Sequence, residues 1–527
     1  MIPSDTRPCE NGRQAAAEDL RHLTVILGIL LLGIYLFWVW RFWPFTVDDA
    51  YISARYARNL VRGYGLVYNP GERVMGYTNL SLTLIETLVE QFGLDGVLAA
   101  KIVGVAAGAG VLGLTFLLAR KAGGSVGAAT LAIAFLAVYP PLAISAVMGI
   151  ETTLFVLFLL MFLLLFLRFL DRPGGAAFQF FLAASLWMAT VTRPEGLGVA
   201  LLSLVLSIAG IRPSGRVAIR PIGWGAIYGL MLAPVLIWLS VYYGSPVPNT
   251  FFAKTASGWM PEKYLAGLVY VFMWLTDYQT LLLLLPPLLG ALKVRGSERA
   301  VVLAVFLAFY MAYVIYAGGD WMPGYRFLLP AMPLYFILAS LGLDRVWQIL
   351  RSHLLPAGHL WGIVLFLCFV TLSLPTMVKE DQYVLSRAQG YQQAHFAVGM
   401  WLRENSSPDA SVALMDIGLI GYVSDRYVLD ITGLTSREVA RIAHRGGGWT
   451  LAPEEVAIQV ADYVLSREPD YIVLAHFTPS LDLFAGWRFD WAIFHSPSFS
   501  ARYQHIFTVQ HMDEYYLSVF GKRGSTR

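Results

Sequence analysis

The stretch that decides the fold is residues 23–43, LTVILGILLLGIYLFWVWRFW. A helix needs about 20 predominantly apolar residues to cross the hydrocarbon core of a bilayer, and this run is long enough. Arg7, Arg13 and Arg21 precede it, in the charge layout of a signal peptide. The run is too long for the apolar region of a signal peptide and lacks a small-residue cleavage site. We therefore predict an uncleaved membrane span.

Apolar runs of this kind recur along most of the chain. The 527 residues are 57% hydrophobic and only 14% charged, with a mean hydropathy of +0.59, whereas soluble domains are about 25% charged. The sequence thus predicts an α-helical polytopic membrane protein with about 11 transmembrane helices. Beyond the first, they are predicted at 97–119, 125–145, 151–169, 176–192, 196–211, 222–243, 270–292, 300–317, 327–343 and 359–377.

Basic residues gather in alternate predicted loops, which sets the orientation of the spans. Lys and Arg are enriched in the cytoplasmic loops of membrane proteins. The side of the N-terminal arginines also carries Arg120, Lys121, Arg168, Arg172, Arg212, Arg216, Arg220, Lys293, Arg295, Arg299, Arg345 and Arg351. The bias predicts a cytoplasmic N-terminus and, for an odd number of spans, an external C-terminus.

The opposite side carries longer loops that are polar, aromatic and rich in Gly and Pro. Short connections would be enough to join helices, so these loops indicate a functional outer face. Within the first of them, Asn79–Phe92 is apolar but too short to span. It is predicted to be an amphipathic helix along the membrane interface. The outer segments are 44–96, 145–151, 193–195, 244–264, 318–326 and the residues after about 378.

From about residue 380 the pattern changes to that of a soluble α/β domain of ordinary size. The predicted division is a transmembrane module with outer-face catalytic loops at 1–379 and an extracytoplasmic α/β domain at 380–527. Helices are predicted at 388–404 and from Pro453 to Arg467, and strands at Ser411–Met415, Tyr427–Ile431, Tyr471–Ala475, 503–509 and 514–520.

Two adjacent carboxylates, Asp48 and Asp49, follow the first span by a few residues. Adjacent carboxylates repel each other, and a low local dielectric raises their pKa values. Such a pair can act as a general base or hold a divalent cation. The alternative interpretation is structural: an acidic N-cap for a helix at Ala50–Arg62.

Six segments spread over the membrane region form a wider pattern. They are DDAYISARYARNL (48–60), NPGERVMGYTN (69–79), MGIETTLF (148–155), TRPEG (192–196), PNTFFAKT (248–255) and GGDWMPGYRFLLP (318–330). Their combination resembles the GT-C fold glycosyltransferases that use polyprenyl-phosphate sugars, in particular the mycobacterial terminal arabinofuranosyltransferase group and its bacterial relatives. DIGLIGY…LDITGLT (416–435) is similar to the extracytoplasmic domain of these relatives.

The resemblance implies a GT-C fold in a bacterial plasma (inner) membrane, with the site between the outer membrane face and the soluble domain. It also implies that the acidic motif of the first loop holds the catalytic carboxylate. We expect Asp48 to be the base and Asp49 a supporting or alternative carboxylate. Many relatives have DE where this chain has DD, which leaves the division of labour between the two open.

The transfer chemistry needs cations as well as a base. The departing phosphate needs its charge neutralised, and the acceptor hydroxyl needs its proton removed. Lys254, Arg326 and Arg193 lie on the predicted outer side and are the candidates for holding the phosphate. Interfacial snorkelling is the alternative for all three, and a structural pair with Glu195 explains Arg193 nearly as well.

Further polar residues of the outer face are candidates for substrate binding. Glu151 could bind sugar hydroxyls or orient a catalytic group, or it could stabilise a helix N-terminus. Asp320 could hydrogen-bond the donor sugar or fix Arg326, or it could simply belong to a Gly-rich turn.

Tyr51, Arg55 and Tyr77 could line the site, although aromatic belts occur at membrane interfaces without a ligand. The nine histidines show no zinc-like spacing, so no metal site and no cofactor is predicted. A divalent cation is possible but not indicated. The net charge of +3 gives no argument for nucleic acid binding.

We therefore expect a membrane glycosyltransferase that moves an arabinofuranose- or mannose-like sugar from a polyprenyl-phosphate carrier to an extracytoplasmic cell-envelope acceptor. A transporter or flippase for lipid-linked sugars is one alternative, but transporter sites lie near the bilayer midplane, whereas the charged residues here gather at one face. A non-catalytic envelope scaffold is another. The expected partners are the lipid bilayer, the polyprenyl-phosphate sugar and a glycan or other envelope acceptor.

Overall fold

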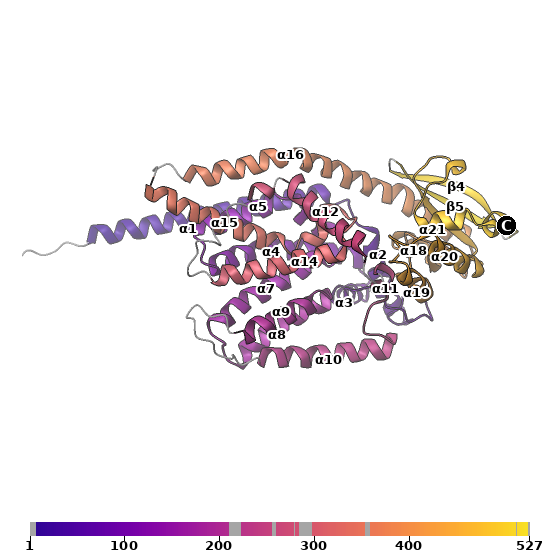
Figure 1. The fold of residues 1–527 in the computed structure, drawn as a ribbon, viewed down its shortest axis with the longest axis horizontal. Helices are drawn as coiled ribbons and strands as arrows, with labels where there is room; N and C mark the ends of the chain where they lie inside the picture. The colour runs from indigo at the N-terminus through magenta and orange to yellow at the C-terminus, as the bar shows by residue number, and fades with distance from the viewer. Residues whose placement is uncertain are drawn as a thin grey trace, which may run out of the picture.

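The computed structural model describes residues 7–209, 223–255, 260–278, 280–283, 298–353, 359–512 and 514–524. Long helices run side by side as a bundle, and a small α/β layer lies at one end of it (Figure 1). The N-terminal end of α1 (Arg7–Phe42) lies at the opposite end (Figure 1).

The bundle helices follow the apolar runs of the sequence. They are α1, α4 (Gly96–Lys121), α5 (Val126–Val138), α6 (Pro140–Val147), α7 (Thr152–Asp171), α8 (Ala176–Thr192), α9 (Gly196–Ile208), α10 (Gly223–Tyr243), α12 (Pro261–Asp277), α14 (Glu298–Ala317), α15 (Met332–His353) and α16 (His359–Gly390). α7 is apolar on nearly every side, and it packs between α4 and α8 in the interior. A helix that is hydrophobic all round is a buried one.

The predicted count of eleven spans is not confirmed. In the described part of the chain, five helices are by themselves long and apolar enough to cross a membrane: α1, α4, α7, α10 and α14. The predicted span 125–145 is broken into α5 and α6, which meet at an angle of 57°. Pro140 lacks a backbone N–H and restricts the residue before it, so the helix cannot continue straight through. Part of the predicted span 270–292 lies outside the described residues.

The loops predicted on the basic side meet at one end of the bundle. Lys121 and Arg299 both pair with Asp171, at 2.8 and 2.9 Å, and the side chain of Ser125 donates to Asp344 at 3.0 Å. The two ion pairs thereby join the ends of α4 and α7 to the start of α14, and the hydrogen bond joins the α4–α5 connection to α15. The basic residues predicted at 212, 216, 220, 293 and 295 lie outside the described residues.

Short helices occupy the other end of the bundle. They are α2 (Asp48–Val61), α3 (Leu80–Glu90), α11 (Asn249–Lys254), η1 (Thr280–Leu283) and η2 (Pro323–Leu328). α3 confirms the helix predicted at Asn79–Phe92, and it packs against α2, α4 and α8. Figure 1 shows α2, α3 and α11 next to the α/β layer.

The α/β layer follows α16 without a break in the helix path. Its elements are η3 (Tyr391–His395), α17 (Phe396–Asn405), β1 (Ser411–Leu414), α18 (Leu419–Ser424), β2 (Tyr427–Asp430), α19 (Arg437–Arg445), α20 (Glu454–Ser466), β3 (Tyr471–His476), η4 (Leu481–Leu483), α21 (Arg488–Phe494), α22 (Pro497–Arg502), β4 (Tyr503–Met512) and β5 (Tyr515–Lys522). All five predicted strands are confirmed, with no end more than three residues from its predicted position. Because α16 runs through residue 380, the predicted boundary between two domains stays a prediction.

The strands form one mixed sheet in the order β2-β1-β3-β5-β4. β1 is parallel to both β2 and β3, and β5 is antiparallel to β3 and β4. Every residue of β3 is buried, as expected of a strand covered on both faces. Successive residues of a strand point to opposite faces, and accordingly the sheet contributes to two separate cores.

One of these cores joins the sheet to the first outer loop. Val412, Leu414 and Val473 pack there with α17 and with loop side chains that include Tyr56, Tyr68, Met75 and Tyr77. The opposite face of the sheet is covered by α19, α20, α21 and α22. The first outer loop and the layer therefore share a hydrophobic core, which fixes the loop that carries the acidic pair.

Candidate active site

Asp48 lies where the first outer loop meets the α/β layer. It is the first residue of α2, and only 6% of its surface is exposed. Its Oδ2 accepts the backbone N–H of Gly418 at 2.8 Å, and its Oδ1 accepts that of Leu419 at 2.7 Å. A Cβ added at Gly418 would lie 1.9 Å from the backbone oxygen of Asp48, so no side chain fits there. The carboxylate is therefore held in one orientation.

The acidic pair does not cap its own helix, contrary to the structural alternative. The N-cap of α2 is Val47, and no side chain provides a capping hydrogen bond. Asp48 instead binds the first backbone N–H groups of α18, in the segment DIGLIGY. Asp49 is half-buried, and no residue in the described ranges forms a hydrogen bond with its carboxylate.

The pKa of Asp48 is raised from its usual range to about 7. Burial is the main cause, because it disfavours the charged form, and the charge of Asp416 adds to it. His395 and the backbone N–H of Leu419 act in the opposite direction. A carboxyl group with a pKa near the working pH is suited to general base catalysis.

A buried group of acidic, histidine and tyrosine side chains surrounds Asp416. His395 Nε2 lies 2.8 Å from Oδ2 of Asp416, and the hydroxyl of Tyr515 donates to the same oxygen at 2.7 Å. Burial would raise the pKa of Asp416, but these hydrogen bonds outweigh it and the pKa is lowered. Burial also lowers the pKa of His511 to about 3, with the charges of His395 and Arg387 as further causes. At neutral pH Asp416 is thus charged and His511 is neutral.

Sequence reasoning assigned no role to this group. Asp416 belongs to the segment DIGLIGY, which resembles the extracytoplasmic domain of the relatives. His395 and His511 carry no signal in the local sequence, because they meet only through the tertiary fold. The ring centroids of His395 and His511 are 4.8 Å apart, and each lies within 5 Å of the ring of Tyr391.

Arg55 clamps the first outer loop onto the layer. It is buried, and its guanidinium donates to the carbonyl oxygens of Tyr68 at 2.9 Å, Gly421 at 2.5 Å and Arg426 at 2.6 Å. A fourth hydrogen bond reaches the side chain of Asn69 at 3.3 Å. With its donors occupied by the protein, Arg55 holds the structure of the site rather than lining it.

The two predicted site tyrosines differ in their surroundings. Tyr77 is buried, and its hydroxyl lies 3.2 Å from that of Tyr243. Tyr51 is half-buried one turn after Asp48, with its ring 5.4 Å from that of Tyr422. Burial raises the pKa of Tyr51 to about 12, so its hydroxyl stays protonated. Of the two, Tyr51 is the one that lies beside Asp48 on α2.

Glu151 belongs to a second polar group, at the outer ends of α7 and α8. Arg193 pairs with Glu195 at 2.6 Å and with Glu151 at 3.5 Å. Asn79 donates to Glu151 at 3.2 Å. The predicted structural pair of Arg193 with Glu195 is therefore present, and two carboxylates already neutralise this guanidinium. Glu86 of α3 lies near Glu151, fully buried, and no residue of the described ranges bonds to either of its carboxyl oxygens.

The segment GGDWMPGYRFLLP places Arg326 beside the same group. Arg326 Nε donates to Asp320 at 2.7 Å, and both side chains are buried. Asp320 therefore fixes Arg326, which is one of the two roles predicted for it. Gly324 and Tyr325 both have positive φ, at 76° and 47°, which turns the chain sharply just before Arg326. Arg326 and Arg193 flank the ring of Phe327, at 5.0 and 5.4 Å from its centroid.

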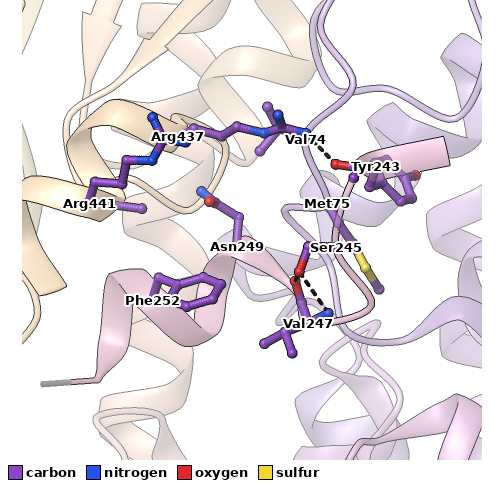
Figure 2. Close-up of a pocket in the computed structure, with 11 residues that line it drawn as sticks. Val74, Met75, Tyr243, Ser245, Val247, Asn249, Phe252, Arg437 and Arg441 are labelled. Atoms are coloured by element: carbon purple, nitrogen blue, oxygen red, sulfur yellow. Dashed lines mark hydrogen bonds between the residues drawn. The ribbon is translucent and has the colours of Figure 1, made fainter. Parts of the chain in front are cut away.

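Lys254 ends α11 and is exposed. The segment around it serves as a junction, because Asn249 donates to the carbonyl oxygens of Gly433 and Leu434 and its own N–H binds Met75. A cavity of about 240 Å³ opens beside this junction. Figure 2 shows it between the first outer loop, the end of α10, α11 and α19, with Arg437 and Arg441 on one side. The cavity is separate from Asp48.

The structure thus distributes the predicted residues over four places. The contact between α2 and the layer holds Asp48, Asp49 and Tyr51. The outer end of the bundle holds Glu151, Arg193, Asp320 and Arg326. Lys254 lies at the surface beside α19. Arg55 and Tyr77 lie in the core between loop and layer.

Comparison with known proteins gives matches in sequence and in fold. The model of a domain of unknown function, DUF8728, matches residues 381–520. The terminal beta-(1->2)-arabinofuranosyltransferase of Corynebacterium glutamicum is 27% identical over 372 residues, which cover 60% of this chain and 52% of that protein. The enzyme of the same name from Mycobacterium tuberculosis is 27% identical over 337 residues, or 56% and 52%. The chain spans about half the length of these curated relatives.

Solved structures share the fold. ArnT from Cupriavidus metallidurans bound to undecaprenyl phosphate matches with a TM-score of 0.57 at 14% identity, over 95% of this chain and 98% of that one. The oligosaccharyltransferase AglB from Archaeoglobus fulgidus, in complex with an inhibitory peptide and a dolichol-phosphate, matches with a TM-score of 0.52 at 12% identity, over 86% and 69%. The predicted GT-C fold and the predicted resemblance are confirmed. The chain is a multi-pass membrane protein similar in sequence to terminal arabinofuranosyltransferases.

Proposed function

We propose that this protein is a membrane glycosyltransferase that moves an arabinofuranose- or mannose-like sugar from a polyprenyl-phosphate carrier to an extracytoplasmic cell-envelope acceptor. The observation that carries the proposal is the state of Asp48. Its carboxylate is buried, is oriented by two backbone N–H groups and has a pKa of about 7. The curated relatives named as arabinofuranosyltransferases support the choice of sugar class.

In the proposed reaction Asp48 takes the proton of the acceptor hydroxyl. The acceptor oxygen forms a bond to the anomeric carbon of the sugar while the bond from that carbon to the phosphate oxygen breaks. The bonding electron pair leaves with the phosphate, so positive charge near the phosphate favours the transition state. Each oxygen of Asp48 accepts one N–H and keeps a lone pair for the proton.

The other candidates take roles according to their partners. Arg326 and Lys254 remain the proposed phosphate contacts, since Arg326 has one carboxylate partner and Lys254 is exposed. Arg193 is neutralised by two carboxylates and acts as a structural residue. Asp49, half-buried next to the base, raises the pKa of Asp48 by its charge.

We further propose that the protein lies in a bacterial plasma membrane with its N-terminus cytoplasmic and the α/β layer outside. The support is the alternation of basic loops. Cysteine labelling from outside in intact cells tests it, with single cysteines at Ser407 in the layer and at Gly175 between α7 and α8, in a variant without Cys9 and Cys368. Ser407→Cys is expected to be labelled and Gly175→Cys protected. The reverse pattern overturns the orientation.

The test of the activity is a donor-panel assay in membranes containing the full chain. Polyprenyl phosphates of arabinose, mannose and aminoarabinose are offered, with and without EDTA, and Asp48→Asn serves as the inactive reference. Transfer from one donor that needs Asp48 supports the proposal. Movement of a donor across the bilayer without transfer would indicate a lipid-linked-sugar flippase instead, and loss of transfer in EDTA would reveal a divalent cation.

A further inference from the structure

The C-terminal end of α16 carries an arginine held among aromatic rings. The guanidinium carbon of Arg387 lies 4.8 Å from the ring centroid of Trp321, 5.5 Å from that of Tyr383 and 5.7 Å from that of Tyr391. Trp321 lies in the loop before η2, in the segment GGDWMPGYRFLLP. The two tyrosines lie on α16 and at the start of η3, one helical turn before and one turn after Arg387. Cation–π contacts of this kind hold a cation without neutralising its charge.

The hydrogen bonds of Arg387 are incomplete. One terminal nitrogen donates to the hydroxyl of Tyr383 at 2.6 Å, and the other lies 3.3 Å from the hydroxyl of Tyr391. Its Nε is buried and has no hydrogen-bond partner among the described residues. A guanidinium offers five N–H donors, so donors remain for another molecule.

The charge of Arg387 also lacks a counter-charge. Two carboxylates pair with Arg193 and one with Arg326, and Arg41 on the neighbouring helix pairs with Asp381. Within the described ranges, no carboxylate forms an ion pair with Arg387. A half-buried cation without a carboxylate is costly at a membrane surface unless an anion joins it.

The position of Arg387 suits an anion that reaches the site from the bilayer. Tyr391 packs on Phe45, three residues before Asp48, with ring centroids 6.4 Å apart. Trp321 and Tyr383 are 45% and 38% exposed, so the aromatic side of the group opens to the surface. α16 runs along the edge of the bundle and ends at the α/β layer (Figure 1). Arg387 is three residues from that end of the helix, and the proposed orientation puts this end outside.

We propose that Arg387 binds the phosphate of the polyprenyl-phosphate carrier, with its free terminal N–H groups donating to phosphate oxygens. The inference rests on the proposed function and deepens it. Trp321 and Tyr383 then contact the first apolar units of the carrier chain, and Arg387 adds a cation to the proposed phosphate contacts Arg326 and Lys254. Arg387 is a binding residue: it holds the leaving group and does not take the proton.

Binding of undecaprenyl monophosphate to the purified full chain tests the proposal, in nanodiscs of phosphatidylcholine. Arg387→Met is expected to weaken binding at least about tenfold, the loss typical of charge-assisted hydrogen bonds. Arg387→Lys is expected to recover part of the affinity, because a point charge replaces the fork of donors. Arg441→Met is the matched control, since Arg441 is an exposed arginine of α19 paired with Glu438. Unchanged affinity in Arg387→Met overturns the proposal.

Two further arms identify the source of the phosphate. Inorganic phosphate and phosphatidylglycerol are offered in place of the carrier lipid, and both are expected to bind at least tenfold more weakly. Equal binding of phosphatidylglycerol would show a general anionic-lipid site and overturn the proposal. If Arg387→Met does not fold, the double variant Tyr383→Phe, Tyr391→Phe removes both hydroxyls that orient the guanidinium while keeping its charge, and it is expected to weaken binding severalfold.

Transfer kinetics separate this inference from the proposed function. If the wild type transfers sugar and Arg387→Met raises the donor KM with a smaller change in kcat, both stand. If the wild type transfers sugar and the donor KM of Arg387→Met is unchanged, only the inference fails. If the wild type neither transfers sugar nor binds the carrier lipid, the proposed function fails and the inference fails with it.

Discussion

The contact between the first outer loop and the α/β layer differs from the polar group behind α3 in how its buried charges are satisfied. At the contact, Arg55 makes four hydrogen bonds and both oxygens of Asp48 accept backbone N–H groups. Behind α3, Glu86 is fully buried and neither of its oxygens has a partner in the described structure. Satisfied groups hold a fold together, whereas an unsatisfied buried group is stable only if it is neutral or has another use.

The comparison predicts which substitutions change the stability of the fold and which change the rate of transfer. Substitution of Asp48 should change both, because the same carboxylate anchors the layer and takes part in the proposed proton transfer. Substitution of Arg55 should change the stability of the fold. Glu86 has neither role: its burial keeps it uncharged at neutral pH, and it makes no hydrogen bond with the described residues.

The largest effect is expected for Asp48→Asn. A general base typically contributes a factor of about 10² to 10⁴ in rate, so transfer should fall by that amount. Asn also sets an NH₂ group against one of the two backbone N–H groups, which should cost about 1–3 kcal/mol of stability. Initial rates and thermal unfolding of the purified variant measure the two losses separately.

Asp49→Asn is the control for Asp48→Asn, since it removes a neighbouring charge that makes no hydrogen bond with the described residues. It should retain most of the activity and all of the stability. An inactive Asp49→Asn beside a near-normal Asp48→Asn would reverse the roles of the two carboxylates.

The next effect is expected for Arg55→Leu. It removes the four hydrogen bonds of a buried guanidinium, two of them to carbonyl oxygens of the layer, which should destabilise the protein by about 3–5 kcal/mol. Thermal unfolding measures the loss. Arg62→Ala, directly after the end of α2, removes an exposed ion pair with Asp425 of the layer and should cost less than about 1 kcal/mol. Equal melting temperatures for the two variants would mean that the contact between loop and layer does not support the fold.

These contacts mark the limit of what the sequence could predict. Hydropathy alone predicted α7 and the first span, because a bilayer requires long apolar runs, and short apolar runs between predicted helices indicated the five strands. Asp48 and Gly418 are 370 residues apart, and neither residue type announces such a pair. Pro140 signals a break in a helix, but the residues around it are apolar, and 125–145 was therefore predicted as one continuous span.

The roles of the predicted site residues could be anticipated only where their partners are close in sequence. Arg193 beside Glu195 and Asp320 near Arg326 were close in sequence, so their pairing could be anticipated. Arg55 was expected to line the site, but it holds the loop to the layer, because two of its partners, Gly421 and Arg426, come from the layer. Arg387 and His395 stand in an ordinary helical pattern, and their neighbours come from distant segments.

A smaller effect is expected from pH. The pKa of Asp48 is raised to about 7, so the carboxylate is mostly protonated below that value and ionised above it. Because only the ionised form can accept a proton, kcat/KM should rise about tenfold per pH unit below 7 and level off above it. A pH–rate profile in membranes measures this. Asp49→Asn should move the midpoint downward, since the charge of Asp49 raises the pKa of its neighbour; a flat profile between pH 5 and 8 would remove Asp48 from the reaction.

The smallest effect is expected for Glu86→Gln. Burial raises the pKa of Glu86 well above its usual range, and the charges of Glu151, Glu90 and Asp95 add to the shift. The folded protein therefore keeps the proton of this carboxyl at neutral pH. At pH 4, where the unfolded chain also keeps much of it, Gln of the same shape and charge should change the stability by less than about 0.5 kcal/mol. Because the folded-state pKa is raised, the wild type should lose stability as pH rises above the ordinary value for Glu, whereas Glu86→Gln should not lose that part. Thermal unfolding at pH 4 and pH 8 should thus show nearly equal melting temperatures at pH 4 and a higher one for Glu86→Gln at pH 8. A variant that melts below the wild type at pH 8 would show that Glu86 is ionised in the folded protein, and the contrast between the two regions would then be wrong.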